Sequence, residues 1–241
     1  MAGHSKWANI KHRKAAQDAK RGKAFTRLIR ELVVASRQGG PSVEDNSRLR
    51  TAVDKALGAN MTRDTIDRAI SRGSGNSDSD NLDEITYEGY ASGGVAVLIE
   101  AMTDNRNRTV AEVRHAFSKH GGNLGTDGSV AYLFERKGFL LFSNGIEEDA
   151  IMDVALDSGA EDVISHSDGL TEVTMAWEAF SEVRQAFENA GIAFMQADIS
   201  MLPATCIPLD PSGVKQVMQL VEALEDLDDV QNVYTNAEWP E

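Results

Sequence analysis

The stretch GFLLFSNGIEEDAIMDVALDSGAEDVISHSDGLTEVTMAW, residues 138–177, decides the fold class of this chain. It begins with a short apolar strand pattern, continues with a helix pattern, and ends with two further strand patterns. The next segments, FSEVRQAFENAG and IAFMQADISML, add a second helix and a fourth strand. The resulting order is β-α-β-β-α-β, which is the order of a ferredoxin-like unit. We therefore expect residues 136–201 to form one α/β domain.

The segments on either side of this domain each hold an incomplete set of similar elements. ITYEGYA and VAVLIEAMT predict strands, NRTVAEVRHAFSKHGG predicts a helix, and SVAYLFE predicts a third strand. Near the end of the chain, PSGVKQVMQLVEALEDLDD predicts a helix and VQNVYTN a strand. That final pair is too small to bury a core of its own. We therefore expect residues 82–135 and 202–241 to form one discontinuous domain, with residues 136–201 inserted in it.

The N-terminal part, residues 1–75, predicts a three-helix domain. The first helix runs from about residue 14 to residue 37, the second begins near residue 46, and the third spans residues 62–73. In the first helix, apolar residues recur at helical spacing and form one stripe: Phe25, Leu28, Ile29, Leu32 and Val33. The predicted fold class is α+β, with an N-terminal three-helix domain followed by two ferredoxin-like α/β domains, one inserted in the other.

The charge of the chain is divided unevenly along its length. The formal net charge is −14, yet residues 1–75 contain 16 Lys or Arg and 7 Asp or Glu. The remaining residues contain 8 basic and 31 acidic side chains. Such a split is typical of a protein that binds nucleic acid or another anionic surface at one end. The acidic remainder would repel a phosphate backbone, and it is suited to basic protein partners.

The basic end is the main candidate binding site. Lys and Arg supply most nucleic-acid affinity by neutralising phosphates, and Trp7 either stacks on a base or docks on the helical domain. Farther along, Arg106 and Arg108 lie at a predicted helix N-terminus, where backbone N–H groups favour anions. The alternatives are a solvated basic helix and arginines that pair with nearby carboxylates while Asn105 or Thr109 caps the helix. The predicted nucleic-acid-binding residues are Lys6, Trp7, Lys11, His12, Arg13, Lys14, Lys20, Arg21, Lys23, Arg27, Arg30, Arg106 and Arg108.

No motif in the chain predicts catalysis, a cofactor or a metal site. GxxxxGK[ST] is missing, and GGNLGTDGS follows a helix and precedes a strand, the reverse of a dinucleotide-binding turn. We interpret that loop as a helix C-cap and a tight turn. His115 and His120 are five positions apart and do not share a helix face. The single cysteine, Cys206, indicates a reducing, cytoplasmic setting, and no apolar run approaches the roughly 18 residues that span a membrane.

Four long strings of this sequence resemble the signature blocks of the YebC/PmpR family. They are GHSKWANIKHRKAAQDAKRGKAFTRLIREL, RLRTAVDKALGANMTRDTIDRAISRG, YEGYASGGVAVLIEAMTDNRNRTVAEVR and GGNLGTDGSVAYLF. The family also contains the mitochondrial translational activator of cytochrome c oxidase subunit I. The resemblance covers the whole chain and is densest in residues 3–30 and 87–134. It implies an N-terminal helical domain, two α/β domains with one inserted in the other, and a non-enzymatic cytoplasmic regulator of gene expression.

The resemblance and the charge distribution leave several functions open. The leading interpretation is a DNA-binding transcriptional regulator that acts through the basic N-terminal arm and helix. The sequence shows no recognition helix with Asn, Gln or Arg placed to read base edges, which favours a structured RNA target. The alternative is therefore a ribosome- or ribosomal-RNA-associated translation factor that assists the synthesis of proline-rich stretches. A metal-dependent nuclease built from scattered acids is the third.

Overall fold

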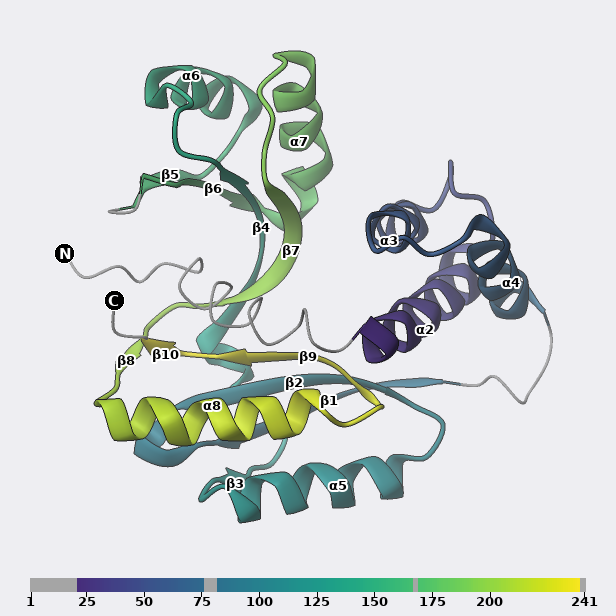
Figure 1. Cartoon of the computed structure of the whole chain (residues 1–241), viewed down its shortest axis with the longest axis vertical. Helices are drawn as coiled ribbons and strands as arrows, with labels where there is room; N and C mark the ends of the chain where they lie inside the picture. Colours follow the sequence, from purple (N-terminus) through teal and green to yellow (C-terminus); the bar gives the residue numbers. More distant parts are fainter. Residues whose placement is uncertain (1–20, 76–81, 167–168, 239–241) are drawn as a thin grey trace. The chain divides into compact units, whose positions relative to one another are not determined.

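The structure, a computed structural model, describes residues 21–75, 82–166 and 169–238, with side chains from Lys23 onward. These residues form two compact units (Figure 1). The first unit contains residues 21–131 together with Leu209–Ala237. The second consists mainly of Tyr132–Pro208, which in the sequence lies between the two parts of the first.

The first unit begins with a bundle of three helices, α2 (Arg21–Gly39), α3 (Ser47–Gly58) and α4 (Arg63–Ser74). The side chains of Asn46 and Thr62 accept hydrogen bonds from backbone N–H groups in the first turns of α3 and α4, which satisfies donors that have no partner inside the helix. The predicted apolar stripe of α2 packs into the bundle core, where Leu32 and Leu49 are fully buried. The three predicted helices are confirmed over the part of the chain that the structure describes.

Helix α4 crosses α2 at very short range, and a glycine makes that approach possible. A Cβ atom added to Gly73 would lie 2.3 Å from the carbonyl oxygen of Val33 and 2.8 Å from the Cβ atom of Ser36. Ser36 contributes to the same contact, because its hydroxyl donates to the Ile70 carbonyl at 2.7 Å. Gly73, the last residue of the predicted third helix, is therefore the packing point of α2 and α4.

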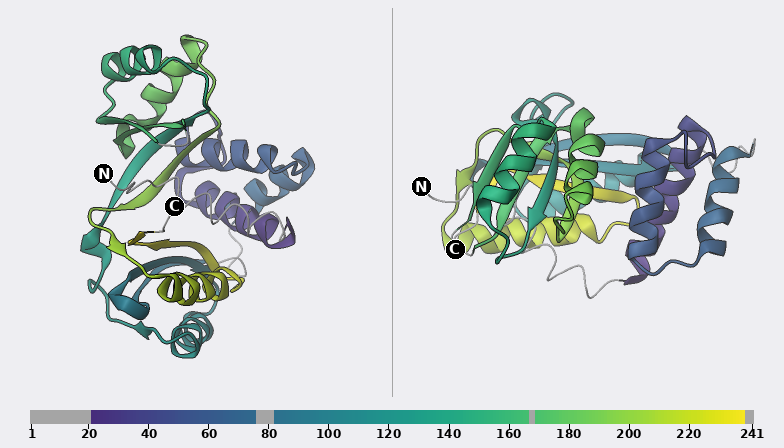
Figure 2. Two further views of the ribbon diagram at one scale, coloured as in Figure 1. Left: turned by 60° about the vertical axis from the view of Figure 1, so that its left-hand side comes forward. Right: turned by 90° about the horizontal axis from the view of Figure 1, so that it is seen from above.

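A four-stranded sheet completes the first unit, in the order β3-β1-β2-β9. Its strands are β1 (Asp83–Tyr90), β2 (Ala96–Thr103), β3 (Asn123–Leu124) and β9 (Val230–Thr235). Strand β2 is buried along nearly its whole length and pairs antiparallel with both β1 and β9. Helices α5 (Arg106–Lys119) and α8 (Pro211–Glu225) lie on one face of the sheet (Figures 1 and 2). The C-terminal helix and strand thus join the earlier strands, although more than 100 residues separate β2 from β9.

One predicted strand in this region is wrong. SVAYLFE was expected to pair as the third strand of the sheet, but Ala131–Leu133 form a 3₁₀ turn, η3, and the sheet instead uses β3. The carboxylate of Glu88 explains the difference, because it accepts hydrogen bonds from the N–H groups of Gly128, Val130 and Ala131 at 2.6–2.7 Å. Those donors are therefore not available for a strand ladder.

The second unit has the predicted β-α-β-β-α-β order. Its elements are β4 (Phe134–Phe142), α6 (Glu148–Ser158), β5 (Asp162–Ser165), β6 (Thr171–Ala176), α7 (Phe180–Asn189) and β7 (Gln196–Pro203). The sheet order β5-β6-β4-β7 is that of a ferredoxin-like fold. Both helices cover one face of the sheet and form the core with Leu140, Phe142 and Val173 (Figure 2).

The remaining short elements are η2 (Ser92–Gly94) between β1 and β2, η4 (Trp177–Ala179) before α7, and the strands β8 (Ile207–Pro208) and β10 (Ala237–Glu238), which pair with each other. The predicted α+β fold class, with an N-terminal helical region followed by sheets with helices, is confirmed. The exact domain boundaries at residues 75, 82, 135 and 202 stay a prediction. Over the described residues, no helix is both long and apolar enough to cross a membrane.

Candidate nucleic-acid interface

The two faces of α2 have different partners. The apolar face packs inside the helical bundle, and the opposite face carries three cations, Lys23, Arg27 and Arg30, which we call the α2 cation row. Their spacing of four and three residues places them on one side of the helix. All three belong to the predicted nucleic-acid-binding set. In the structure, their donors point at another part of the first unit.

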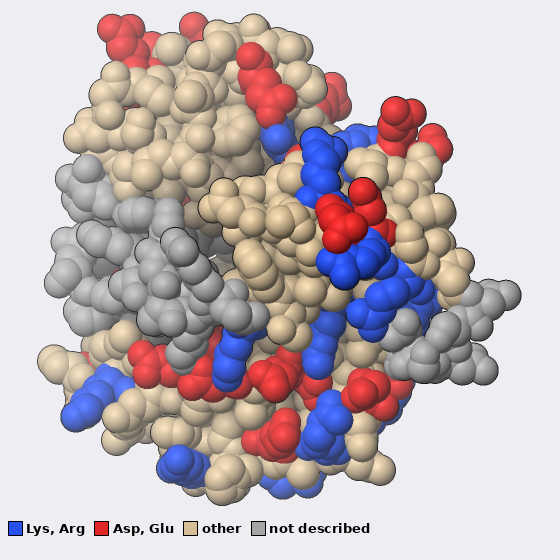
Figure 3. Space-filling model, turned by 45° about the vertical axis from the view of Figure 1, so that its right-hand side comes forward, with Lys and Arg blue, Asp and Glu red and all other residues tan. Residues whose placement is uncertain are grey.

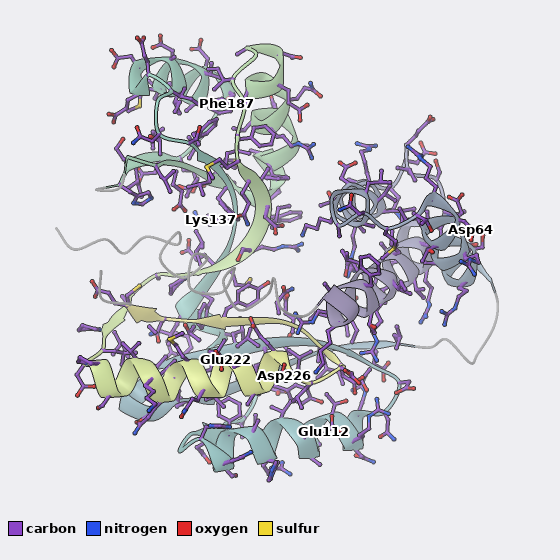
Figure 4. All side chains as sticks on the ribbon, in the orientation of Figure 1. Asp64, Glu112, Lys137, Phe187, Glu222 and Asp226 are labelled. Carbon is purple, nitrogen blue, oxygen red and sulfur yellow. The ribbon has the colours of Figure 1, made fainter. Side chains whose placement is uncertain are left out.

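Two members of the row contact the end of α8. The Lys23 ammonium donates to the main-chain carbonyl of Asp226 and lies 3.8 Å from its carboxylate. The Arg27 guanidinium donates to the carbonyl of Glu225, the last residue of α8. The last four carbonyls of a helix have no partner within it, and they form the negative end of the helix dipole. The α2 cation row therefore caps the C-terminus of α8, whose Asp226 is labelled in Figure 4.

Arg30 makes the third set of contacts. Its Nη1 lies 2.9 Å from Oδ1 of Asp229 and donates to the carbonyls of Asp228 at 2.6 Å and Met102 at 3.0 Å. The Asp229 side chain is 1% exposed, and that of Arg30 is 19% exposed. This buried ion pair joins the helical bundle to β2 and to the segment between α8 and β9. We call residues 225–229 the α8 C-terminal segment.

The Asp229 carboxylate also pairs with Arg108, one of the two arginines of the second predicted cluster. Oδ2 of Asp229 accepts from Nη2 of Arg108 at 2.7 Å, from the Thr109 hydroxyl at 2.7 Å and from the Thr103 hydroxyl at 3.2 Å. Burial alone would raise the pKa of Asp229, but these donors and Arg30 outweigh burial and hold it below its usual value. Asp229 thus lies between two arginines that are far apart in the sequence.

The arginines at the start of α5 are also paired with nearby acids. Nε of Arg106 donates to Oδ2 of Asp83 at 2.7 Å, which lowers the pKa of that carboxyl. Arg108 donates to Oδ1 of Asp104 at 2.8 Å in addition to Asp229. The Asn105 side chain caps α5 by accepting from the backbone N–H of Arg108. The structure therefore shows the pairing and capping that the sequence left as an alternative, while the side chain of Arg108 remains 43% exposed.

Most of the basic arm lies in the part of the chain that the structure does not describe. Lys6, Trp7, Lys11, His12, Arg13, Lys14 and Lys20 lie outside the described residues, and Arg21 starts α2 without a described side chain. The predicted site is therefore described only in part. Within the described part, Asp229 brings Arg30 and Arg108 together, whereas Arg106 pairs separately with Asp83. Figure 3 shows that basic and acidic side chains are interleaved on the face it presents.

Sequence reasoning missed Asp229 as the centre of this cluster. It is one of four acids in the run EDLDD at residues 225–229, and nothing in that run distinguishes it from Asp228, which is exposed. Its partners lie 120 residues or more away in the sequence. The carbonyl acceptors of Lys23 and Arg27 are main-chain groups, so no side-chain pattern could identify them.

The other candidate chemistries gain no support from the described residues. The glycine-rich loop at residues 121–129 is held by the carboxylate of Glu88, and the three donated N–H bonds keep the pKa of Glu88 low despite its burial. Within the loop, the N–H of Gly128 binds this carboxylate, and those of Gly122 and Gly125 bind the carbonyls of Phe117 and Glu88. These donors are therefore already used and do not form a ready phosphate cradle. Within the described ranges, no group of three His, Cys, Asp or Glu side chains is placed to hold a metal ion.

The fold and the site define a multidomain α+β protein whose basic helical domain is joined by ion pairs to an acidic α/β part. Residues 5–76 match the family model described as the TACO1/YebC protein N-terminal domain, and residues 82–237 match the TACO1/YebC second and third domain. The chain belongs to the TACO1/YebC family, and the resemblance to YebC/PmpR proteins is confirmed.

Similar proteins carry regulatory names. A "Probable transcriptional regulatory protein" from Hahella chejuensis is 63% identical over 241 residues, which cover 100% of this chain and 97% of the relative. The "Transcriptional regulatory protein PmpR" of Pseudomonas aeruginosa is 62% identical with the same coverage. The crystal structure of a conserved hypothetical protein from Aquifex aeolicus has a TM-score of 0.86 and 47% identity, and the match covers 98% of both chains. The names of the Hahella and Pseudomonas relatives describe a regulatory protein rather than an enzyme.

Proposed function

We propose that this protein is a non-enzymatic, DNA-binding transcriptional regulator that contacts DNA through its basic N-terminal arm and first helix. One observation carries the proposal: residues 1–30 contain nine Lys or Arg and one acid in a chain with a net charge of −14. Phosphate neutralisation by Lys and Arg supplies most sequence-independent affinity for DNA. The regulatory names of close relatives support the same role.

The acidic remainder of the chain helps to define where DNA binds. Residues 76–241 contain 31 acids and 8 Lys or Arg, so a phosphate backbone is repelled from most of this surface. Contact is then confined to the basic end and to local cations such as Arg108. The same acidic surfaces are suited to basic protein partners, which we propose as a secondary role.

A second candidate, a translation factor that binds ribosomal RNA, is favoured by the surface of the helical bundle. The exposed face of α4 mixes signs, because Arg68 pairs with Asp64 at 2.8 Å and Asp67 is exposed beside them. The commonest base contacts in the major groove come from Arg, Lys, Asn and Gln side chains, and on this face the Arg68 guanidinium is paired with a carboxylate instead. In this second role, the protein assists the ribosome in the synthesis of proline-rich stretches. Both targets are found in the bacterial cytoplasm, where we propose that the protein acts.

A charge-reversal experiment tests the proposed binding surface. Lys11, Arg13, Lys14 and Lys20 are replaced with Glu, and binding to a fluorescently labelled DNA duplex and to a labelled ribosomal RNA hairpin is measured by anisotropy. We expect the variant to lose binding to its target while the thermal transition of the described fold is unchanged. Preferred binding of the duplex supports the regulator, and preferred binding of the hairpin supports the translation factor.

The matched control changes the same amount of charge elsewhere. Arg63, Arg114, Lys119 and Lys215 are exposed cations outside the N-terminal arm, and replacing them with Glu should leave affinity within a few-fold of the wild type. For about six phosphate contacts, the wild-type affinity should fall on the order of 10³ between about 50 and 200 mM salt. Unchanged binding by the arm variant, or a response to salt that is flat, would contradict the proposed function.

A further inference from the structure

The α2 cation row already has oxygen partners within the chain. Lys23 and Arg27 donate to carbonyls of the α8 C-terminal segment, and Arg30 contacts the same segment at Asp228 and Asp229. Every member of the row thus has an acceptor within residues 225–229. Arg30 has one further acceptor, the carbonyl of Met102. These contacts join the helical bundle to the end of α8.

The donors that make these contacts are the donors that a phosphate backbone would use. Guanidinium and ammonium N–H groups bind phosphate oxygens with the same short geometry that they use for carbonyl and carboxylate oxygens. The hydrogen bonds of Lys23 and Arg27 go to neutral carbonyls, with the Asp226 carboxylate 3.8 Å from the Lys23 ammonium. A charged phosphate oxygen is a stronger acceptor than a neutral carbonyl. A donor directed at the end of α8 must turn away from it to bind a phosphate.

We propose that the nucleic-acid backbone and the α8 C-terminal segment compete for the α2 cation row, so that binding of nucleic acid loosens the docking of the helical domain. This inference rests on the proposed function and adds a regulation of the same site. The docked arrangement is then the low-affinity state, and release of the row produces the high-affinity state.

A second set of contacts, made by Arg48 and Gln38 with Glu84, is of a kind that a polyanion can displace. Nη2 of Arg48 lies 2.6 Å from Oε1 of Glu84, and Nε2 of Gln38 donates to Oε2 of Glu84 at 2.5 Å. The side chains of Arg48 and Glu84 are 36% and 40% exposed. Exposed ion pairs of this kind contribute little, because water and salt screen them. The Arg30–Asp229 pair is more buried, with side chains that are 19% and 1% exposed.

The competition couples nucleic-acid binding and docking of the helical domain in both directions. If bound nucleic acid weakens docking by some factor, enforced docking must weaken nucleic-acid binding by the same factor. Gln38 and Glu84 offer a place to enforce docking without touching the α2 cation row. Their side chains meet across the interface, and the chain has one native cysteine, Cys206, which is removed by replacement with Ser.

The first experiment locks the helical domain in place. Gln38→Cys and Glu84→Cys are combined in a Cys206→Ser background, and the pair is joined with a short bismaleimide. We expect the joined protein to bind the labelled duplex or hairpin at least about fivefold more weakly than the same protein before joining, the low end of typical coupling. Equal affinity before and after joining would overturn the inference.

A matched control uses the same reagent within one helix. Asp64→Cys and Arg68→Cys lie four residues apart on α4, so joining them does not bridge α2 and the α/β part. Their affinity should be the same before and after reaction. If neither form of any variant binds nucleic acid, the proposed function fails together with the inference; binding that is insensitive to the lock contradicts the competition alone.

The second experiment measures the effect of bound nucleic acid on the docking of the helical domain. Donor and acceptor dyes are placed at Asp64→Cys on α4 and Glu112→Cys on α5, both labelled in Figure 4, again in the Cys206→Ser background. Saturating duplex or hairpin should change the energy transfer between the dyes, because release of the row frees α4 from its fixed position relative to α5. Constant transfer during a titration in which anisotropy shows full binding would overturn the inference.

Discussion

Arg30 and Arg108, which are 78 residues apart in the sequence, share the buried carboxylate of Asp229, at 2.9 Å and 2.7 Å. One arginine comes from the helical bundle and the other from the helix that follows β2. The carboxylate lies between α8 and β9, in the part of the first unit that is contributed by the C-terminal end of the chain. A single acid therefore connects three segments that the chain brings together only by folding.

Removal of Asp229 should destabilise the first unit strongly. Asp229→Ala leaves Arg30 and Arg108 without their buried counter-ion and removes the carboxylate that accepts from the hydroxyls of Thr103 and Thr109. We expect the free energy of unfolding to fall by about 3 kcal/mol, as for other broken buried pairs. Asp228→Asn is the matched control, since its side chain is exposed, and it should change stability by less than about 0.5 kcal/mol. Urea denaturation of both variants measures the difference; equal stabilities would contradict the role given to Asp229.

Acid should weaken the protein partly through the same carboxylate. The folded-state pKa of Asp229 is lowered, so it lies below the value of about 3.9 for an unfolded aspartate. The stabilisation from ionised Asp229 is therefore complete above about pH 4 and is lost as pH falls through the folded-state pKa. Asp229→Asn should show a shallower fall of stability below about pH 4 than the wild type. Urea titrations over this range test it, and parallel curves for the two proteins would argue against the shifted pKa.

The carboxylate of Glu88 should matter for the loop at residues 125–131. Glu88→Gln replaces an acceptor of three backbone N–H groups with an amide that presents its own donors to them. We expect a loss of about 2 kcal/mol in the free energy of unfolding. Asp127→Asn, an exposed change in the same loop, is the control and should be nearly neutral. A neutral Glu88→Gln variant would show that the loop does not depend on this carboxylate.

Two glycines in the helical bundle should respond oppositely to alanine. Gly73→Ala places a Cβ atom 2.3 Å from the Val33 carbonyl, so α2 and α4 must move apart, at a cost of about 1–3 kcal/mol. Gly58→Ala, at the end of α3, meets nothing within 4 Å and should be neutral or stabilising by up to about 1 kcal/mol. Thermal melts of the two variants give the comparison, and similar melting temperatures would be inconsistent with the close crossing.

The sequence predicted the elements well because their patterns are local. Apolar residues at helical spacing identified the bundle, and the order of strand and helix patterns identified the ferredoxin-like unit. SVAYLFE was misassigned because its apolar residues look like a strand, while the donors at residues 128–131 are bound to Glu88. The pairing of Lys23, Arg27 and Arg30 was not predictable, since their acceptors are carbonyls and a carboxylate about 200 residues away.

The central claim, that the basic N-terminal arm contacts nucleic acid, is tested most directly by photo-crosslinking in cells. A benzophenone amino acid replaces Ile10, and a control protein carries it at Leu156, a 69% exposed position in the second unit. We predict that position 10 captures promoter DNA and that position 156 does not; ribosomal RNA at position 10 would shift the assignment to the translation factor. Capture of protein alone at position 10, or the same nucleic-acid yield at both positions, would contradict the claim.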